Sequence, residues 1–175
     1  MLPLIRMIGL YLILGIGVCK CQTTRQSITV CDLMKDLQSF RGKLIGVSGS
    51  LLMTEELIVL RAGECEHRFV TEGFAWPRYI SLVTPSHPAR RIDPKEMDIE
   101  VDDEAFKLLS EVNSLLHRLK LKRHMFVTVV GKLIVREKYI VHHTDRGAVS
   151  VDGFGHLGAA PAMLVVQSVQ EVTIR

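Results

Sequence analysis

The segment GFGHLG, at residues 153–158, has the glycine spacing G-x-G-x-x-G of a dinucleotide-binding loop. In such loops the glycines let the backbone approach a pyrophosphate, and a helix begins directly after them. Here Ala159, Ala160 and Pro161 lead instead into an apolar, β-branched segment with the pattern of a strand. We therefore predict a glycine-rich turn with Phe154 packed inward, and no bound nucleotide or other cofactor.

Histidine and acidic side chains near the same end of the chain are candidate metal ligands or catalytic groups. They are His142, His143, Asp145 and His156. A zinc site needs three or four ligands that converge as a tetrahedron. Adjacent histidines on a strand point to opposite faces, so only one of His142 and His143 could join such a site. We predict no metal site, and a metal-assisted or hydrolytic enzyme that uses the His142 and His156 end is the alternative function.

The rest of the sequence carries no pattern typical of a catalytic nucleophile or an acid–base pair. The G-x-S-x-G elbow of serine hydrolases does not occur. The paired carboxylates at 55–56 and 102–104 lie in turn or helix-start contexts, where acidic residues serve solubility and capping. The sequence therefore names no catalytic residue and favours a non-catalytic protein.

The first 21 residues have the layout of a secretory signal peptide. Arg6 precedes an apolar run at Met7–Val18, and we expect cleavage near Cys19 or Cys21. The run is shorter than the ~20 residues that a membrane-spanning helix needs, so a retained anchor is the alternative. Neither cysteine follows the small residue that lipidation requires. We predict export to the periplasm, the cell envelope or the medium, with membrane contact only if the segment is retained.

Removal of this segment leaves two cysteines, Cys31 and Cys65. Thiols of exported proteins meet an oxidising environment, in which pairing is the usual outcome. We therefore predict a disulfide between Cys31 and Cys65, with two separate buried thiols as the alternative.

The charge of the exported chain indicates no particular partner. The 22 basic residues include Arg6 and Lys20 of the first 21, so 20 remain against 19 acidic residues, a net charge of +1. The basic cluster at 117–124 is typical of a helix C-terminus, where cations offset the negative end of the dipole.

Aromatic content limits the ligands that the protein could bind. Only 6% of the residues are aromatic, whereas proteins that bind single-stranded nucleic acid stack bases on aromatic side chains. This argues against nucleic acid and leaves an envelope protein or a glycan as the expected partner. The residues of the candidate binding loop are Trp76, Tyr139, Phe154 and His156.

An internal repeat organises the chain around these residues. Moving the sequence by 131 − 49 = 82 positions places Gly49 on Gly131, and the surrounding segments LIGVSGSLLMTEELIV and FVTVVGKLIVREKYIV then match. Each copy has the pattern of a long strand with a glycine in its middle, a charged turn and a short return strand. A glycine inside a strand usually marks a bend or bulge. We therefore expect two bent hairpins.

The remaining elements follow from hydrophobic periodicity. A helix is expected from Thr29, its N-cap, to Gly42, and a second helix over Asp103–Lys122. Arg78–Thr84 and Pro161–Ile174 have strand patterns, and Ala62–Pro77 is expected to be a loop. This order predicts a single mainly β domain over residues 22–175. The expected fold is a small OB-fold-like barrel of about five bent strands, with an N-terminal helix and a helix between the third and fourth strands.

Several segments together resemble a group of uncharacterised bacterial exported proteins with an OB-like core. They are the run RGKLIGVSG, the loop with Cys65 and Trp76-Pro77, and the closing GFGHLGAAPAMLVV, which is the most specific part. The matching positions are Cys31, Gly49, Cys65, Trp76, Gly155, His156 and Pro161. The resemblance implies export and the barrel, and it implies no activity.

Overall fold

The computed structural model describes residues 27–54, 56–83, 124–143 and 149–174, together with residues 107, 110, 111 and 114. The predicted signal peptide, residues 1–21, lies outside this part of the chain, and so does Asp145.

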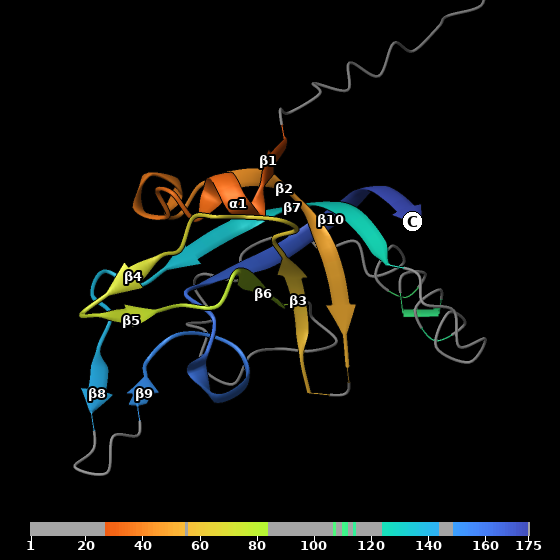
Figure 1. Cartoon of the computed structure of the whole chain (residues 1–175). Coiled ribbons are helices and arrows are strands. Elements are labelled where there is room, and N and C mark those ends of the chain that lie inside the picture. The colour runs from red at the N-terminus through yellow and green to blue at the C-terminus, as the bar shows by residue number, and fades with distance from the viewer. Residues whose placement is uncertain are drawn as a thin grey trace, which may run out of the picture.

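Five strands close into a barrel. Along the chain the elements are β1 (Ser27–Thr29), α1 (Val30–Leu33), η1 (Gln38–Phe40), β2 (Leu44–Met53), β3 (Ile58–Arg61), β4 (Val70–Thr71), β5 (Phe74–Ala75), β6 (Tyr79–Val83), β7 (Met125–Val135), β8 (Val141–His143), β9 (Val149–Val151), η3 (His156–Gly158) and β10 (Ala162–Ile174). The strand order is β1-β2-β3-β6-β10-β7, and β7 also pairs with β2, which closes the barrel (Figure 1). The expected mainly β barrel of five strands is thus confirmed.

The two long strands of the repeat lie side by side. β2 and β7 pair antiparallel, and Val47 is the partner of Val129. These two residues are also 82 positions apart, so the repeat relates β2 to β7 by an approximate two-fold axis through this pair. Both side chains are fully buried. The repeat therefore forms the seam at which the barrel closes.

The long strands β2 and β7 are curved (Figure 1), and their central glycines allow neighbouring chain segments to approach closely. A Cβ atom on Gly49 would lie 2.9 Å from both the carbonyl oxygen of Arg61 and Cγ2 of Val30. A Cβ atom on Gly131 would collide with the carbonyl oxygen of Val165. The sequence predicts a bend or bulge at these glycines, and the structure adds a steric reason for them, the close approach of neighbouring backbone.

The core fills the barrel and extends beneath the N-terminal segment. Apolar residues point inward at alternate positions of the five barrel strands, as the period of two requires. The largest fully buried side chains are Trp76, Leu33, Met34, Leu37, Leu60, Ile80, Leu133, Met163, Leu164, Val30 and Val47.

The predicted N-terminal helix is wrong in its length. Thr29 is the N-cap as expected, and its Oγ1 accepts a hydrogen bond from the Asp32 amide at 3.0 Å, but α1 is only one turn long. Further on, the Asp36 carboxylate accepts a hydrogen bond from the Ser39 amide, and the Ser39 hydroxyl donates one to the Asp36 backbone carbonyl. Such local side-chain bonds compete with the helical backbone pattern.

The apolar positions of this predicted helix are nevertheless buried as expected. Val30, Leu33, Met34 and Leu37 are at most 1% exposed. A single helical turn followed by a 3-10 turn keeps three- and four-residue spacing well enough to place all four side chains in the core.

Four residues of the predicted second helix are described. Lys107, Ser110, Glu111 and Ser114 are helical and exposed. The apolar positions of that helix lie outside the described residues, so its bounds and its packing between the third and fourth barrel strands remain a prediction.

The second predicted hairpin is wrong. The return segment forms β8, which pairs with β9 and not with β7. The edge of β7 is taken by β10, in a register that runs from Ala162 opposite Val135 to Ile174 opposite Met125. The predicted loop at Ala62–Pro77 also contains a small hairpin, β4–β5.

The turns of the two repeat copies explain their different courses. In the first copy the Thr54 amide donates to the Leu57 carbonyl at 2.8 Å, and the Leu57 amide donates to Thr54 Oγ1 at 3.0 Å, which closes a tight turn. The equivalent residues 82 positions later are Arg136 and Tyr139. Arg136 has no hydroxyl with which to close such a turn, and both side chains bind elsewhere.

Candidate functional site

The predicted binding residues lie where three connections meet at one end of the barrel. These connections are the β2–β3 turn, the β3–β6 segment with its β4–β5 hairpin, and the β7–β10 segment with its β8–β9 ribbon (Figure 1). We call residues 153–158, between β9 and β10, the glycine loop.

The glycine loop is closed by its own backbone. The Gly153 amide donates to the Gly158 carbonyl at 2.9 Å, and Phe154 and Ala160 exchange hydrogen bonds of 2.8 and 3.0 Å. The loop contains the three-residue η3 and then leads into strand β10, as the sequence predicts. The Gly158 amide donates to the Gly155 carbonyl. The amides of Gly153, Phe154 and Gly158 therefore already donate hydrogen bonds to backbone carbonyls, whereas a phosphate-binding loop must leave such amides free for its ligand.

Four aromatic rings pack together beneath the loop. The ring centroid of Trp76 lies 5.0 Å from that of Tyr139 and 5.2 Å from that of Phe74, and the Tyr139 and Phe69 centroids are 5.1 Å apart. Trp76 and Tyr139 are 2% and 6% exposed. The structure therefore brings two of the four predicted binding residues into contact, and it places both inside the fold.

Hydrogen bonds hold the polar atoms of both buried rings. Trp76 Nε1 donates to Thr71 Oγ1 at 2.7 Å. Thr71 lies at the end of β4, where Glu72 and Gly73 both have positive φ, the geometry of a tight two-residue hairpin turn. The Tyr139 hydroxyl donates to the Pro161 carbonyl at 2.5 Å, and burial raises the pKa of this phenol above its ordinary value. Tyr139 is therefore a neutral donor that joins the end of β7 to the start of β10.

Arg136 connects β7 to the glycine loop. Its Nη2 donates to Asp152 Oδ1 at 3.2 Å and to the Gly153 carbonyl at 3.3 Å. Its guanidinium lies 4.9 Å from the centroid of the half-buried Phe154 ring. The third predicted binding residue is thus held by a cation–π contact, a favourable placement for an arginine.

His156, the fourth predicted binding residue, is exposed on the loop. Its Nε2 lies 3.6 Å from Glu56 Oε2 in the β2–β3 turn. His142 and His143 are exposed on β8, where they pair with Ser150 and Val149 and point to opposite faces of the ribbon. In the parts of the chain that the structure describes, no three histidine, cysteine, aspartate or glutamate side chains lie where they could share a metal ion.

The glycine loop also touches the outer face of the barrel. Val59 pairs with Ser81, and Ser81 pairs with Met163, so these side chains form a row across β3, β6 and β10. Their chain neighbours Leu60, Ile80, Leu82 and Leu164 belong to the barrel core. Adjacent residues of a strand point to opposite faces, so the row faces outward. We call Val59, Ser81 and Met163 the outer row.

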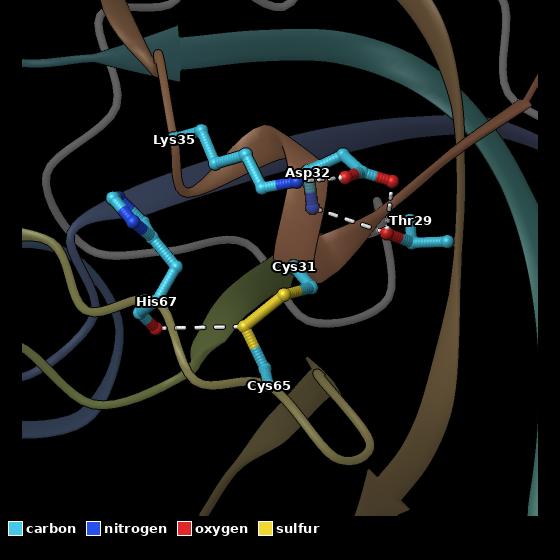
Figure 2. A network of polar contacts seen from close by, with 6 residues as sticks. All are labelled: Thr29, Cys31, Asp32, Lys35, Cys65 and His67. Carbon is cyan, nitrogen blue, oxygen red and sulfur yellow. Dashed lines mark hydrogen bonds and ion pairs between the residues drawn. A yellow bond between two sulfur atoms is a disulfide. The ribbon is translucent and has the colours of Figure 1, made fainter.

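The predicted disulfide between Cys31 and Cys65 is present, with a Cα–Cα distance of 5.7 Å. Figure 2 shows that it joins the single turn of α1 to the segment after β3. The His67 carbonyl oxygen lies 3.4 Å from Cys65 Sγ. The bond indicates that the protein occupies an oxidising environment.

Polar contacts fix the helical turn that carries Cys31 (Figure 2). Asp32 accepts hydrogen bonds from the Lys35 ammonium and the Thr29 hydroxyl, both at 2.7 Å. These bonds, with the charge of Lys35, lower the pKa of Asp32 below its ordinary value.

The sequence-based reasoning missed the residues that hold the loop in place. Arg136, Asp152, Ser81 and Glu56 are far apart in the sequence, and none belongs to a recognisable motif. The repeat did contain one signal, because Arg136 replaces the turn-closing Thr54 of the first copy.

None of the helices that the structure describes is long and apolar enough to cross a membrane. Comparison of the chain with protein-family models, with curated proteins and with solved structures found no match.

Proposed function

We propose that this chain is an exported, non-catalytic binding module of the cell envelope, built on a barrel of the OB type. The glycine loop supplies the observation that carries the proposal. It is a self-bonded loop that presents His156 and Leu157 to solvent, and Leu157 is 83% exposed. A polar and an apolar group held side by side by the hydrogen bonds of one loop are suited to recognition.

Strand order supports the OB type. The barrel order β2-β3-β6-β10-β7 places the third and fifth barrel strands, β6 and β10, in parallel, and it closes through an antiparallel pair between the first and the fourth, β2 and β7. In a five-stranded Greek-key barrel, the loops after the first and fourth strands flank the ligand. Here these are the β2–β3 turn and the β7–β10 segment, which Glu56 and His156 bring together.

Two features support export. A stable disulfide forms where the environment is oxidising. The first 21 residues have the pattern of a cleaved signal peptide, and the resemblance to bacterial exported proteins points to the same location. The mass of the protein recovered from its native host tests this part, because a chain that still begins at Met1 would contradict cleavage.

A capture experiment tests the binding function. The exported protein, immobilised with its disulfide intact, is incubated with an envelope extract of the host. We expect an envelope protein or a glycan to be retained by the wild type and lost with the double variant His156→Ala/Leu157→Ala.

Val172→Thr is the matched control. Val172 is a half-exposed apolar residue on β10, about 33 Å along the strand from Ala162. If the wild type, the double variant and this control retain the same components, the glycine loop is not the binding site.

A further inference from the structure

The outer row is buried although it lies outside the barrel core. Val59, Ser81 and Met163 are 0%, 4% and 1% exposed. A Cβ atom on Gly155 would lie 2.8 Å from Ser81 Oγ, so the loop backbone rests directly on the middle residue of the row. The glycine loop therefore covers at least this part of the outer face.

The path of the loop follows from three contacts. At its start Gly153 packs on the Trp76 ring, since a Cβ atom there would lie 2.6 Å from Cζ3. Gly155 then lies on Ser81, and His156 reaches Glu56 in the β2–β3 turn. The loop thus crosses β6 on the outside of the barrel and ends beside the turn that leads into β3.

The loop is held to the barrel less firmly than it is held together. Its backbone bonds join loop residues to one another or to Ala160. Arg136 and the Trp76 ring hold only its first residues, Gly153 and Phe154, so the rest of the loop can pivot about this base. At its far end the attachment is the His156–Glu56 pair, whose side chains are 44% and 74% exposed, and exposed ion pairs contribute little stability. The tip residue, Leu157, has a φ of 55° and makes little apolar contact, as its exposure shows.

We propose that the glycine loop is a removable cover, and that the outer row beneath it is a binding strip for a polypeptide segment. When the loop lifts, the Ser81 hydroxyl becomes accessible on the outer face of the barrel, between its row neighbours Val59 and Met163. This inference rests on the proposed binding function and locates a second surface for it.

The chemistry of the present occupant favours a polypeptide. What lies on Ser81 is a segment of backbone, at a glycine whose φ of 71° and ψ of −156° only glycine adopts readily. A site that already accommodates backbone at this distance suits another glycine-containing segment better than a bulky sugar ring.

Thiol labelling tests whether the cover is removable. Ser81→Cys places a free thiol under the loop, and Val129→Cys places one in the barrel core, while the native disulfide occupies Cys31 and Cys65. If the loop lifts locally, a small alkylating reagent should label the Cys at 81 at least about tenfold faster than the Cys at 129, which reacts only on global unfolding. Equal rates would overturn the proposal.

Gly155→Ala sharpens this comparison. The methyl group would collide with the residue at 81 and strain the backbone, so labelling at 81 should accelerate further while labelling at 129 changes much less. The matched control is Gly63→Ala, because Gly63 has no atom within 4 Å of its Cβ position. Fluorescence quenching of Trp76, the single tryptophan, reports the same opening independently.

A peptide arm tests the ligand class. The probe is a synthetic peptide, DGFGHLGAAP, which copies residues 152–161. It should slow labelling at 81 in the Ser81→Cys/Gly155→Ala protein, and a scrambled peptide should not. Lack of protection would contradict a polypeptide ligand.

Failure of the envelope capture alone would instead contradict the proposed function, because the labelling rates do not depend on a partner.

Discussion

The two copies of the repeat have the same pattern and different neighbours. The first copy forms the hairpin β2–β3, closed by Thr54 and Leu57. In the second copy Arg136 binds the glycine loop and Tyr139 binds Pro161, so the chain leaves the barrel, forms the β8–β9 ribbon and returns as β10. Two side chains thus convert a simple hairpin into the segment that carries the candidate site.

The copies also differ in covalent support. The disulfide joins residues 31 and 65 and therefore encloses the whole first copy, whereas the second copy lies outside it. The first copy thus has a covalent constraint and the second is held by side-chain contacts. Variants can test each kind of support.

Loss of the disulfide should have the largest effect. For a sequence separation of 34 residues, the chain-entropy model gives about 3–4 kcal/mol of stabilisation. We expect Cys31→Ser/Cys65→Ser to lower the free energy of unfolding by that amount, measured by urea denaturation, and to leave the barrel folded at room temperature. Hydrogen exchange should accelerate in β3 before it does in β7. An oxidised wild type with two titratable thiols would refute the pairing itself.

The strand glycines should come next. We expect Gly49→Ala and Gly131→Ala to cost about 2–3 kcal/mol each, because the new methyl group meets backbone atoms that cannot move alone. Gly131→Ala should be the worse of the two, since its closest neighbour is the Val165 carbonyl of the long strand β10. Urea midpoints give the comparison, with Gly63→Ala as the control in open space. If both variants are as stable as this control, close approach is not what the glycines serve.

These glycines illustrate what could be predicted from the sequence. A period of two, broken by one glycine, identified the long strands, and the repeat identified which strands are related. The disulfide followed from counting cysteines. All of these are local or arithmetic properties of the chain.

The partner of each strand and the contacts of the site could not be predicted in this way. Whether the return segment pairs with β7 depends on competition with β10, which follows β8 only after β9 and the glycine loop. Likewise, the sequence identifies Arg136 only as a charged residue in a turn. Its contact with the Phe154 ring depends on the fold. The helix length was overestimated because Asp36 and Ser39 form local bonds that periodicity does not reveal.

Tyr139→Phe tests the contact that diverts the second copy. The variant keeps the ring packing and removes the hydroxyl bond to Pro161, so we expect a loss of about 1 kcal/mol, measured by thermal or urea unfolding. Trp76 emission should shift little, because the rings stay in contact. The counterpart in the first copy is Thr54→Val, which removes the hydroxyl that accepts the Leu57 amide at an exposed turn. It should cost less than Tyr139→Phe, and the reverse order would contradict a buried anchor at Tyr139.

The smallest expected effect concerns the helical turn that packs on the first copy. Val30 of α1 lies against Gly49, and Asp32 holds this turn through Thr29 and Lys35. Because the pKa of Asp32 is lowered in the folded protein, its contribution is fully present above the unfolded pKa of about 4 and is lost as the pH falls through the folded value.

Asp32→Asn should therefore lower the melting temperature slightly at neutral pH, and the difference from the wild type should shrink as the pH falls through the folded pKa of Asp32, which lies below its ordinary value of 3.8. Glu64→Gln is the control, an exposed carboxylate in the segment before Cys65. Since Val30 of α1 lies against Gly49 in the bend of β2, hydrogen exchange in Asp32→Asn should rise more around Gly49 than around Gly131. An equal rise at both glycines would mean that the two copies are not supported separately.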